Sequence, residues 1–219
     1  MIYANEDGFV YVEIMGAMYG LKQAVKIAND DLIEYLKEFG YYPSRKTPGL
    51  WLHKTRKISF TLVVDDLGVK YIDKADADHL LIAIVELANE WGKILLGIGK
   101  GNNRKWNSRV GDGHNTIKFI HKHQVPRNNK VSYPRFCCYI RSQKEETHRV
   151  IMTVGGDRLD YAGNTATEVA SLETTKIHAN STISTPGARQ AFADIGNFYT
   201  NSRLREPEFM KVHISDISQ

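Results

Sequence analysis

The stretch from residue 60 to residue 72 constrains the fold more than any other part of the sequence. Two apolar, β-prone runs flank an adjacent pair of acidic residues, Asp65 and Asp66. This pattern predicts a β-hairpin with both carboxylates at or beside its turn. Neighbouring carboxylates repel each other unless a cation neutralises them. Hard divalent ions such as Mg²⁺ take oxygen ligands, especially where substrate phosphates complete the coordination. The hairpin therefore favours metal-assisted phosphoryl chemistry.

The charge of the 219-residue chain is unevenly distributed along the sequence. The segment from Lys93 to Arg149 holds 13 Lys/Arg and 3 Asp/Glu, a balance of +10, so the total of +4 leaves −6 for the remainder. Such a basic block is typical of proteins that bind a polyanion, although a solvated basic face is the alternative. Side chains able to stack on bases are interleaved with it: Trp106, His114, Phe119, His121, His123, Tyr133 and Tyr139.

The cysteines and the apolar runs indicate the cellular compartment in which such a chain is expected. No apolar run reaches the roughly 18 residues of a membrane helix, and the N-terminus has no signal-peptide pattern. We therefore expect no membrane partner. The only two cysteines, Cys137 and Cys138, are adjacent, and a disulfide between neighbours is strained. Buried free thiols in a reducing compartment, cytoplasmic or nuclear, are the prediction.

Apolar periodicity predicts a mixture of helices and hairpins, which is an α+β fold. Asp194 stands at the end of the last predicted strand, where it is either a third carboxylate ligand or an ordinary turn or cap residue. Helices are expected at 24–39 and about 74–91, with a helical or mixed segment at about 167–182. Strands are expected at 9–15, 116–120, 136–141, 150–154 and 190–195.

Six short motifs, taken together, resemble the reverse transcriptases of copia-type LTR retrotransposons. They are Tyr19-Gly20-Leu21-Lys22-Gln23-Ala24, Thr47-Pro48-Gly49-Leu50-Trp51, Val63-Val64-Asp65-Asp66, Val154-Gly155-Gly156-Asp157-Arg158-Leu159-Asp160-Tyr161, Ser184-Thr185-Pro186-Gly187-Ala188 and Ala193-Asp194-Ile195-Gly196-Asn197-Phe198-Tyr199. The resemblance covers most of the chain and is weakest at 97–112. It implies a reverse-transcriptase-like palm, an antiparallel sheet with packed helices, plus fingers and no complete thumb.

The resemblance implies an RNA-directed DNA polymerase that acts by two-metal nucleotidyl transfer. Asp194 matches the first catalytic aspartate of the family, and Asp65 and Asp66 match its paired aspartates. These three residues would be the catalytic groups and would hold two Mg²⁺ (or Mn²⁺) ions. The implied partners are an RNA or DNA template-primer and deoxynucleoside triphosphates.

The resemblance also implies residues that contact nucleotide or template. Tyr199 falls where the family places an aromatic residue that excludes a ribose 2′-hydroxyl. Gly20, Lys22 and Gln23 match the loop and helix start that contact the incoming nucleotide and the template strand. Arg149 falls in the fingers strand that supplies cationic contacts to the triphosphate.

The motifs stand in a different order from that of the family, which indicates a circular permutation. The implied natural junction joins the region 208–212 to the strand at 6–10, and chain ends that lie close together tolerate such rewiring. The corresponding domains are a palm part at 1–92, a basic linker at 93–113, a fingers-like segment at 114–189 and a palm strand at 190–219.

Two other functions remain open on the sequence. The family often has arginine where this chain has Ile151, and the loss of that charge favours a catalytically impaired, retrotransposon-derived nucleic-acid-binding remnant. A metal nuclease that uses the same carboxylates is the other alternative. A homodimer formed by exchange of the two halves of the chain is a further hypothesis.

Overall fold

The computed structural model describes residues 4–95, 116–140, 142–143, 147–195, 198–200 and 202–217. Within these ranges the chain forms three α-helices and three open sheets, so the predicted α+β class is confirmed. The chain divides into two compact units, which are described separately. Unit 1 comprises Met1–Ile27, Leu95–Thr165 and Tyr199–Gln219, and unit 2 comprises Ala28–Ile94 and Ala166–Phe198.

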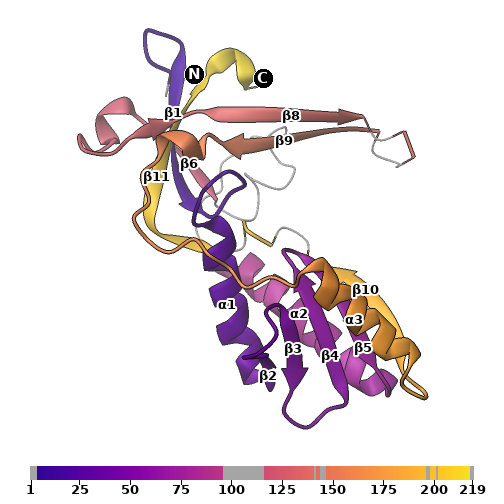
Figure 1. Cartoon of the computed structure of the whole chain (residues 1–219). Helices are drawn as coiled ribbons and strands as arrows, with labels where there is room; N and C mark the ends of the chain where they lie inside the picture. Colours follow the sequence, from indigo (N-terminus) through magenta and orange to yellow (C-terminus); the bar gives the residue numbers. More distant parts are fainter. Residues whose placement is uncertain are drawn as a thin grey trace. The chain divides into compact units, whose positions relative to one another are not determined.

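Unit 2 is built on a five-stranded antiparallel sheet with the strand order β10-β5-β4-β3-β2. Its strands are β2 (Tyr41–Pro43), β3 (Leu50–His53), β4 (Ile58–Val63), β5 (Asp66–Tyr71) and β10 (Arg189–Asp194). The helices α1 (Ala24–Glu38) and α2 (Lys74–Leu95) lie on one side of this sheet, and α3 (Leu172–Ile183) lies on the other (Figure 1).

The two faces of the sheet in unit 2 differ in chemistry. Apolar residues of β4 and β5 are almost fully buried, as are apolar residues of α1 and α2: Phe60, Leu62, Leu67, Val69, Leu32, Leu36, Leu80 and Leu87. On the α3 side, Lys70 Nζ donates to Ser181 O at 3.0 Å and to Thr185 Oγ1 at 2.8 Å. Ser59 Oγ lies 3.0 Å from His178 Nε2. Polar contacts therefore hold α3 against the sheet.

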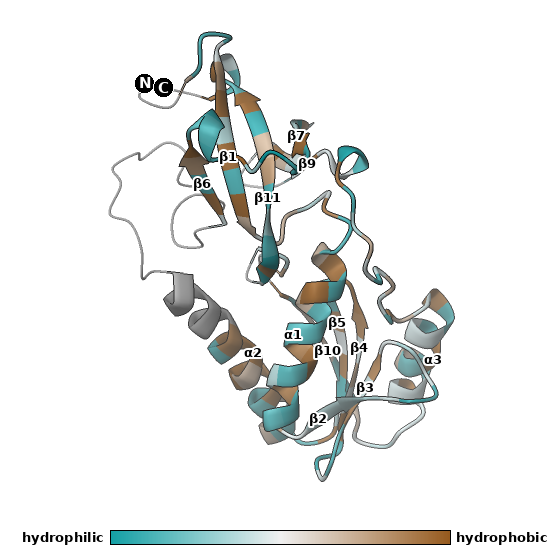
Figure 2. Cartoon of the chain, turned by 90° about the vertical axis from the view of Figure 1, so that its left-hand side faces the viewer, coloured by the Kyte–Doolittle hydropathy of each residue, from teal (hydrophilic) through white to brown (hydrophobic). Residues whose placement is uncertain are grey.

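Unit 1 contains a four-stranded sheet with the strand order β6-β1-β11-β7. Its strands are β1 (Phe9–Gly16), β6 (Ile117–Ile120), β7 (Val131–Ser132) and β11 (Arg203–His213). Brown and teal segments alternate along β1, as expected for a strand with one buried face (Figure 2). β1 and β11 are antiparallel, with Phe9 opposite His213, and Ile214 N donates to Gly8 O at 2.9 Å. The end of β11 therefore lies beside the start of β1.

A two-stranded antiparallel ribbon, β8 (Pro134–Ile140) with β9 (His148–Val154), completes the strands of unit 1. Cys137 is half-buried and Cys138 is exposed, and both are free thiols. The prediction that both cysteines are buried is therefore wrong. The physical reason is that neighbouring residues of a strand point to opposite faces, and a two-stranded ribbon leaves much of its side-chain surface in solvent.

The strands and helices expected from periodicity are present, with ends that differ by a few residues. The strand β11 was not expected as such, because Pro207 and its charged neighbours interrupt any alternating pattern. Short 3₁₀ helices span Lys122–Gln124 (η1), Gly156–Arg158 (η2) and Ile214–Asp216 (η3). The predicted linker at 93–113 lies almost wholly outside the described residues. Among the helices described, none is long and apolar enough to cross a membrane.

Candidate carboxylate site and its surroundings

The aspartate hairpin is confirmed, and its turn holds Asp65 in place. Val63 pairs with Asp66, so Val64 and Asp65 form a two-residue turn between β4 and β5. Val64 has φ 61°, which is rare for a β-branched residue because its side chain crowds the backbone there. Ile195 N donates to Asp65 O at 2.8 Å. This hydrogen bond ties the chain just after β10 to the hairpin turn.

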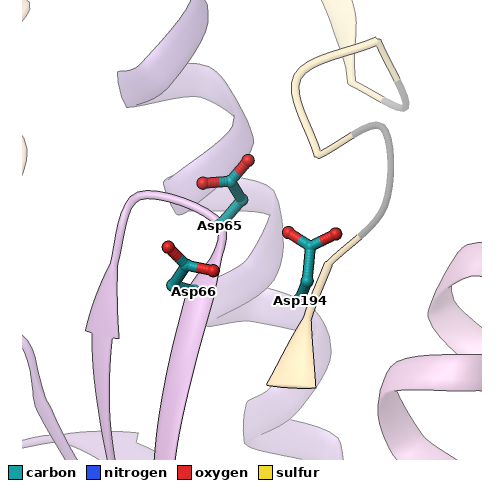
Figure 3. A group of neighbouring side chains, drawn as sticks. All are labelled: Asp65, Asp66 and Asp194. Carbon is teal, nitrogen blue, oxygen red and sulfur yellow. The ribbon is translucent and has the colours of Figure 1, made fainter. Parts of the chain in front are cut away.

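The pairing of β10 with β5 brings the third aspartate to the other two. Asp194 lies directly opposite Asp66 in the register of the two strands. One carboxylate oxygen from each of Asp65, Asp66 and Asp194 lies within 4.8 Å of the other two. Figure 3 shows the three side chains gathered at the hairpin turn and the end of β10. Asp66 and Asp194 are exposed, whereas Asp65 is half-buried. The three carboxylates expected from the motifs therefore form one cluster at one end of the sheet.

Burial and the neighbouring charges both act on the pKa of Asp65. Partial burial raises the pKa of its carboxyl above the ordinary value, and the negative charges of Asp194 and Asp66 raise that pKa further. A backbone hydrogen bond to the carboxylate acts in the opposite direction. Burial and like charge both disfavour the ionised form of the Asp65 carboxyl, whereas a bound cation would favour it.

The donor set of the cluster matches what hard cations bind. Carboxylate oxygens are the protein ligands of Mg²⁺ and Mn²⁺, and the exposure of two of the three side chains leaves room for waters or substrate phosphates. Exposed carboxylates also gather in proteins that bind no metal. Cation binding is therefore a proposal for this chain rather than an observation.

A groove adjoins the carboxylates on the α3 side of the sheet. It has a volume of about 710 Å³, and Asp66 and Asp194 stand among its lining residues. The rest of its lining is mostly apolar and includes Phe192 from β10 and Leu172 from α3. A recess of this size is within the range of small-molecule and nucleotide sites.

The other residues predicted to bind substrate belong to unit 1, where two of them make close structural contacts. Gly20 has φ +97°, and a Cβ at this position would overlap the carbonyl oxygen of Val154. Tyr19 O accepts a hydrogen bond from Val154 N at 2.8 Å. Lys22 Nζ donates to Leu159 O at 3.0 Å, although the side chain is otherwise exposed. The two motifs at 19–24 and 154–161 therefore pack on each other.

Gln23 and Tyr199 are buried inside unit 1. Gln23 is 4% exposed, and its Nε2 donates to Glu208 Oε1 at 3.0 Å. Burial raises the pKa of the Glu208 carboxyl, and the hydrogen bond from Gln23 opposes that rise. Tyr199 is 5% exposed, with its ring edge-on to Tyr19 at a centroid distance of 4.6 Å. These contacts give both residues a structural role in unit 1.

Arg149 lies in β9, where its backbone pairs with Tyr139, and its side chain is outside the described part of the chain. Ile151 lies two residues further along the same strand, is half-buried and pairs with Cys137. The predicted position of Arg149 on a strand is thus confirmed, while its predicted contact with a triphosphate stays a prediction.

Comparison with protein-family models, with curated proteins and with solved structures finds no match for this chain. The resemblance to reverse transcriptases therefore depends on the six sequence motifs alone. Any assignment of function has to come from those motifs and from the geometry of this chain.

Asp66 and Asp194 were singled out from the sequence, but Phe192, Leu172 and Gly68, which also line the groove, were not. Phe192 carried a usable signal, because it stands two residues before Asp194 on a strand and such residues share a face. Gly68 carried the same signal, because it stands two residues after Asp66 on a strand. Leu172 carried none, since only the packing of α3 on the sheet brings it to the groove.

Proposed function

We propose that this chain is the core of an RNA-directed DNA polymerase of the copia-type reverse-transcriptase class, in permuted order. The observation that carries the proposal is the convergence of Asp65, Asp66 and Asp194, which are distant in sequence and fall on family motifs. A palm-like interpretation of unit 2 is supported by its antiparallel sheet, which carries all three aspartates at one end and is covered by helices.

The three carboxylates are the residues that would hold the metal ions of such a polymerase. Asp65, Asp66 and Asp194 would hold two Mg²⁺ or Mn²⁺ ions, whose positive charge would favour ionisation of a primer 3′-hydroxyl and would stabilise the charge on the leaving pyrophosphate. The protein's own contribution is to keep three negative charges together at the end of β5 and β10, where the turn hydrogen bond from Ile195 fixes the backbone of Asp65. Unit 1 is the candidate binder of template-primer, since its 18 Lys/Arg and 11 Asp/Glu give it a net charge of +7.

The strand arrangement in unit 1 supports the permuted order. Because the end of β11 lies beside the start of β1, a short turn could join them as an ordinary hairpin. The unpermuted chain would need such a connection at this place.

A second function is favoured by one specific observation. Ile151 replaces a cationic residue common in the family, and it occupies a half-buried place in β9. A catalytically impaired nucleic-acid-binding remnant would keep the basic unit 1 and tolerate this replacement. It would bind template-primer in a salt-dependent way without extending it.

The test is primer extension on an RNA template with Mg²⁺ or Mn²⁺. The proteins compared are the wild type, Asp65→Asn and Asp194→Asn, with Asp7→Asn as the matched control because Asp7 is exposed and outside the cluster. We expect incorporation that falls roughly 100-fold or more in the two cluster variants, as for the loss of one charge-stabilising group in other active sites. The control should match the wild type.

The other functions predict different results. A binding remnant would give no incorporation in any protein and equal template affinity in all four. A nuclease would shorten the labelled strand without added nucleotides, and this cleavage would be lost in both cluster variants. Incorporation that is unaffected by Asp65→Asn and Asp194→Asn would contradict the assignment of the site.

A further inference from the structure

The strand β10 is an outer strand of the sheet in unit 2, and its outer edge carries unpaired backbone groups. Within the described part of the chain β10 pairs only with β5. The opposite edge of the sheet, β2, is three residues long and ends in Pro43, two features that hinder the addition of a further strand. β10 has six residues and holds neither proline nor lysine. The sheet is therefore protected at β2 and open at β10.

One hydrogen bond shows which backbone groups of β10 face outward. Ile195 N donates to Asp65 O, so the backbone of Ile195 faces the hairpin of β4 and β5. Backbone groups alternate in direction along an antiparallel strand, so Ala193 and Ala191 also face β5. The N–H and C=O groups that face away from the sheet are those of Gln190, Phe192 and Asp194.

The side chains of these three residues lie on the α3 side of the sheet. Gln190 is opposite Lys70, whose Nζ donates to Ser181 Oγ of α3 at 3.1 Å, and alternate residues of a strand share a face. Phe192 is 77% exposed although it is a large apolar residue, and Asp194 is exposed as well. An apolar ring thus stands at the open edge, between an amide and a carboxylate.

We propose that β10 pairs with β10 of a second copy of this chain, antiparallel about a two-fold axis at Phe192, which joins two five-stranded sheets into one. Phe192 then lies opposite the partner's Phe192, and Gln190 lies opposite the partner's Asp194. All the outward backbone groups are paired, because residues opposite each other in such pairs exchange both N–H···O bonds. The Gln190 amide can donate to the partner's Asp194 carboxylate, and the two Phe192 rings cover each other.

The strand is complementary to itself in this register only. A shift of two residues in one direction sets Phe192 against the partner's Asp194, an apolar ring against a charge. A shift of two residues in the other direction leaves Asp194 opposite the partner's Ala188, which lies outside the strand. A shift of one residue sets outward groups against inward groups and leaves the ladder unmade. This self-complementarity favours a second copy, paired as a two-fold dimer, over an unrelated strand.

The position of α3 leaves space for this pairing. α3 packs on β5, β10 and β4 and is centred over β5. In the joined sheet, β5 and the partner's β5 are three strand spacings apart, about 14 Å. A helix with its side chains is about 10–12 Å wide, so the two copies of α3 can lie side by side without overlap.

The first experiment is sedimentation velocity of the full chain over a wide range of concentrations. The variants are Gln190→Pro, which removes an outward N–H that the monomer leaves to solvent, and Phe192→Lys, which sets two cations opposite each other. Tyr42→Lys is the matched control, because Tyr42 is an exposed aromatic residue on the other edge strand, β2. Circular dichroism of each variant checks that it is folded.

We expect the wild type and Tyr42→Lys to show the same monomer–dimer equilibrium. Gln190→Pro and Phe192→Lys should weaken dimerisation roughly 10-fold or more, since each pair of residues occurs twice in a two-fold dimer and every loss is doubled. A wild type that stays monomeric at every concentration overturns the proposal. So does a dimer that neither variant weakens, which is the result expected from exchange of the two halves of the chain.

A disulfide tests the register, in a background that carries Cys137→Ser and Cys138→Ser. Opposite residues of a hydrogen-bonded antiparallel pair have Cα atoms about 5.5 Å apart, which suits a disulfide. Phe192→Cys should therefore give a covalent dimer under mild oxidation. Gln190→Cys is the matched control, because in this register the two copies of residue 190 are about 14 Å apart along the strands. A covalent dimer that forms as readily with Gln190→Cys overturns the register.

These results do not depend on polymerase activity, because every variant leaves Asp65, Asp66 and Asp194 unchanged. A dimer that needs the β10 edge, in a chain that incorporates no nucleotide, supports this inference and leaves the polymerase proposal to fail alone. Incorporation by a chain that stays monomeric has the opposite meaning.

Discussion

The residues that resemble reverse-transcriptase motifs differ between the two units of this chain in their exposure to solvent. Unit 2 carries 11 Lys/Arg and 14 Asp/Glu, a net charge of −3, and two of its three clustered aspartates are exposed. Unit 1 has a net charge of +7, yet its Gln23 and Tyr199 are buried and its Gly20 is in close backbone contact. A motif match alone thus does not separate a residue that faces substrate from one that holds the fold.

The greatest loss of stability should come from disrupting the packing of the two motifs in unit 1. Gly20→Ala should destabilise unit 1 by roughly 3 kcal/mol or more, because a positive φ and an overlap with Val154 O act together. Hydrogen exchange should show loss of protection in β1 while the strands of unit 2 stay protected. Gly187→Ala is the control: its φ is +76° but nothing lies within 4 Å, so about 1 kcal/mol is expected. Equal losses in both units would contradict the division into units.

A smaller effect is expected on the salt dependence of template-primer binding when two cationic residues of unit 1 are neutralised. Arg135 and Arg158 are exposed and lie over the Tyr133 ring, at 5.3 Å and 4.6 Å from its centroid. The double variant Arg135→Gln/Arg158→Gln should reduce the slope of log K against log salt for template-primer binding by about 2, one for each phosphate that the protein no longer neutralises. Lys46→Gln/Lys57→Gln in unit 2 is the matched pair. A reduced slope in this pair instead would assign the nucleic-acid surface to unit 2.

The effect of Asp194→Asn on the stability of unit 2 should change sign when Mg²⁺ is added. Asp194→Asn should stabilise unit 2 by about 0.5–1 kcal/mol in metal-free buffer, because two like charges stand directly opposite each other on paired strands. With Mg²⁺ the wild type should gain stability that the variant lacks. Urea unfolding with and without Mg²⁺ measures both effects, and Asp7→Asn should match the wild type under both conditions. Stability of the wild type that is insensitive to Mg²⁺ and Mn²⁺ would contradict a metal site.

The smallest effect is the contribution of His178, a residue of α3, to the pH dependence of the stability of unit 2. His178 is 6% exposed, and burial, then the charge of Lys70, lowers the pKa of its imidazole below 6.5. Below pH 6.5 the unfolded chain binds a proton at His178 more readily than the folded chain does. The free energy of unfolding of unit 2 should therefore fall as the pH is lowered from 7 to 5. The slope is a fraction of the roughly 1.4 kcal/mol per pH unit for one whole proton.

His178→Gln isolates this contribution, since it should remove part of the slope that the wild type shows between pH 7 and pH 5. His79 also has a lowered pKa, mainly through burial, and its contribution remains in the variant. Chemical denaturation at several pH values gives the difference. An unchanged slope would show that His178 is equally easy to protonate in the folded and unfolded states.

Local patterns predicted most of the secondary structure and part of the site. The helix α1 and the hairpin of β4 and β5 were readable because their apolar periodicity and turn residues lie within a few positions of each other. The strand β11 was missed because its pairing with β1 outweighs the weak strand preference of its proline and charged residues. The exposure of Cys138 was missed because the sequence does not tell whether a hairpin is covered by another layer.

The charge of each segment, the aspartate pair at a turn and the third aspartate at a strand end could be predicted from local sequence. These are properties of neighbouring residues. The pairing of β10 with β5, in the register that places Asp194 opposite Asp66, became known from the three-dimensional structure. That structure also showed that Gly20, Gln23 and Tyr199 are used in packing and that Phe192 borders a groove. Such outcomes depend on contacts between distant segments, and a shift of one residue in register would turn each side chain to the other face of the sheet.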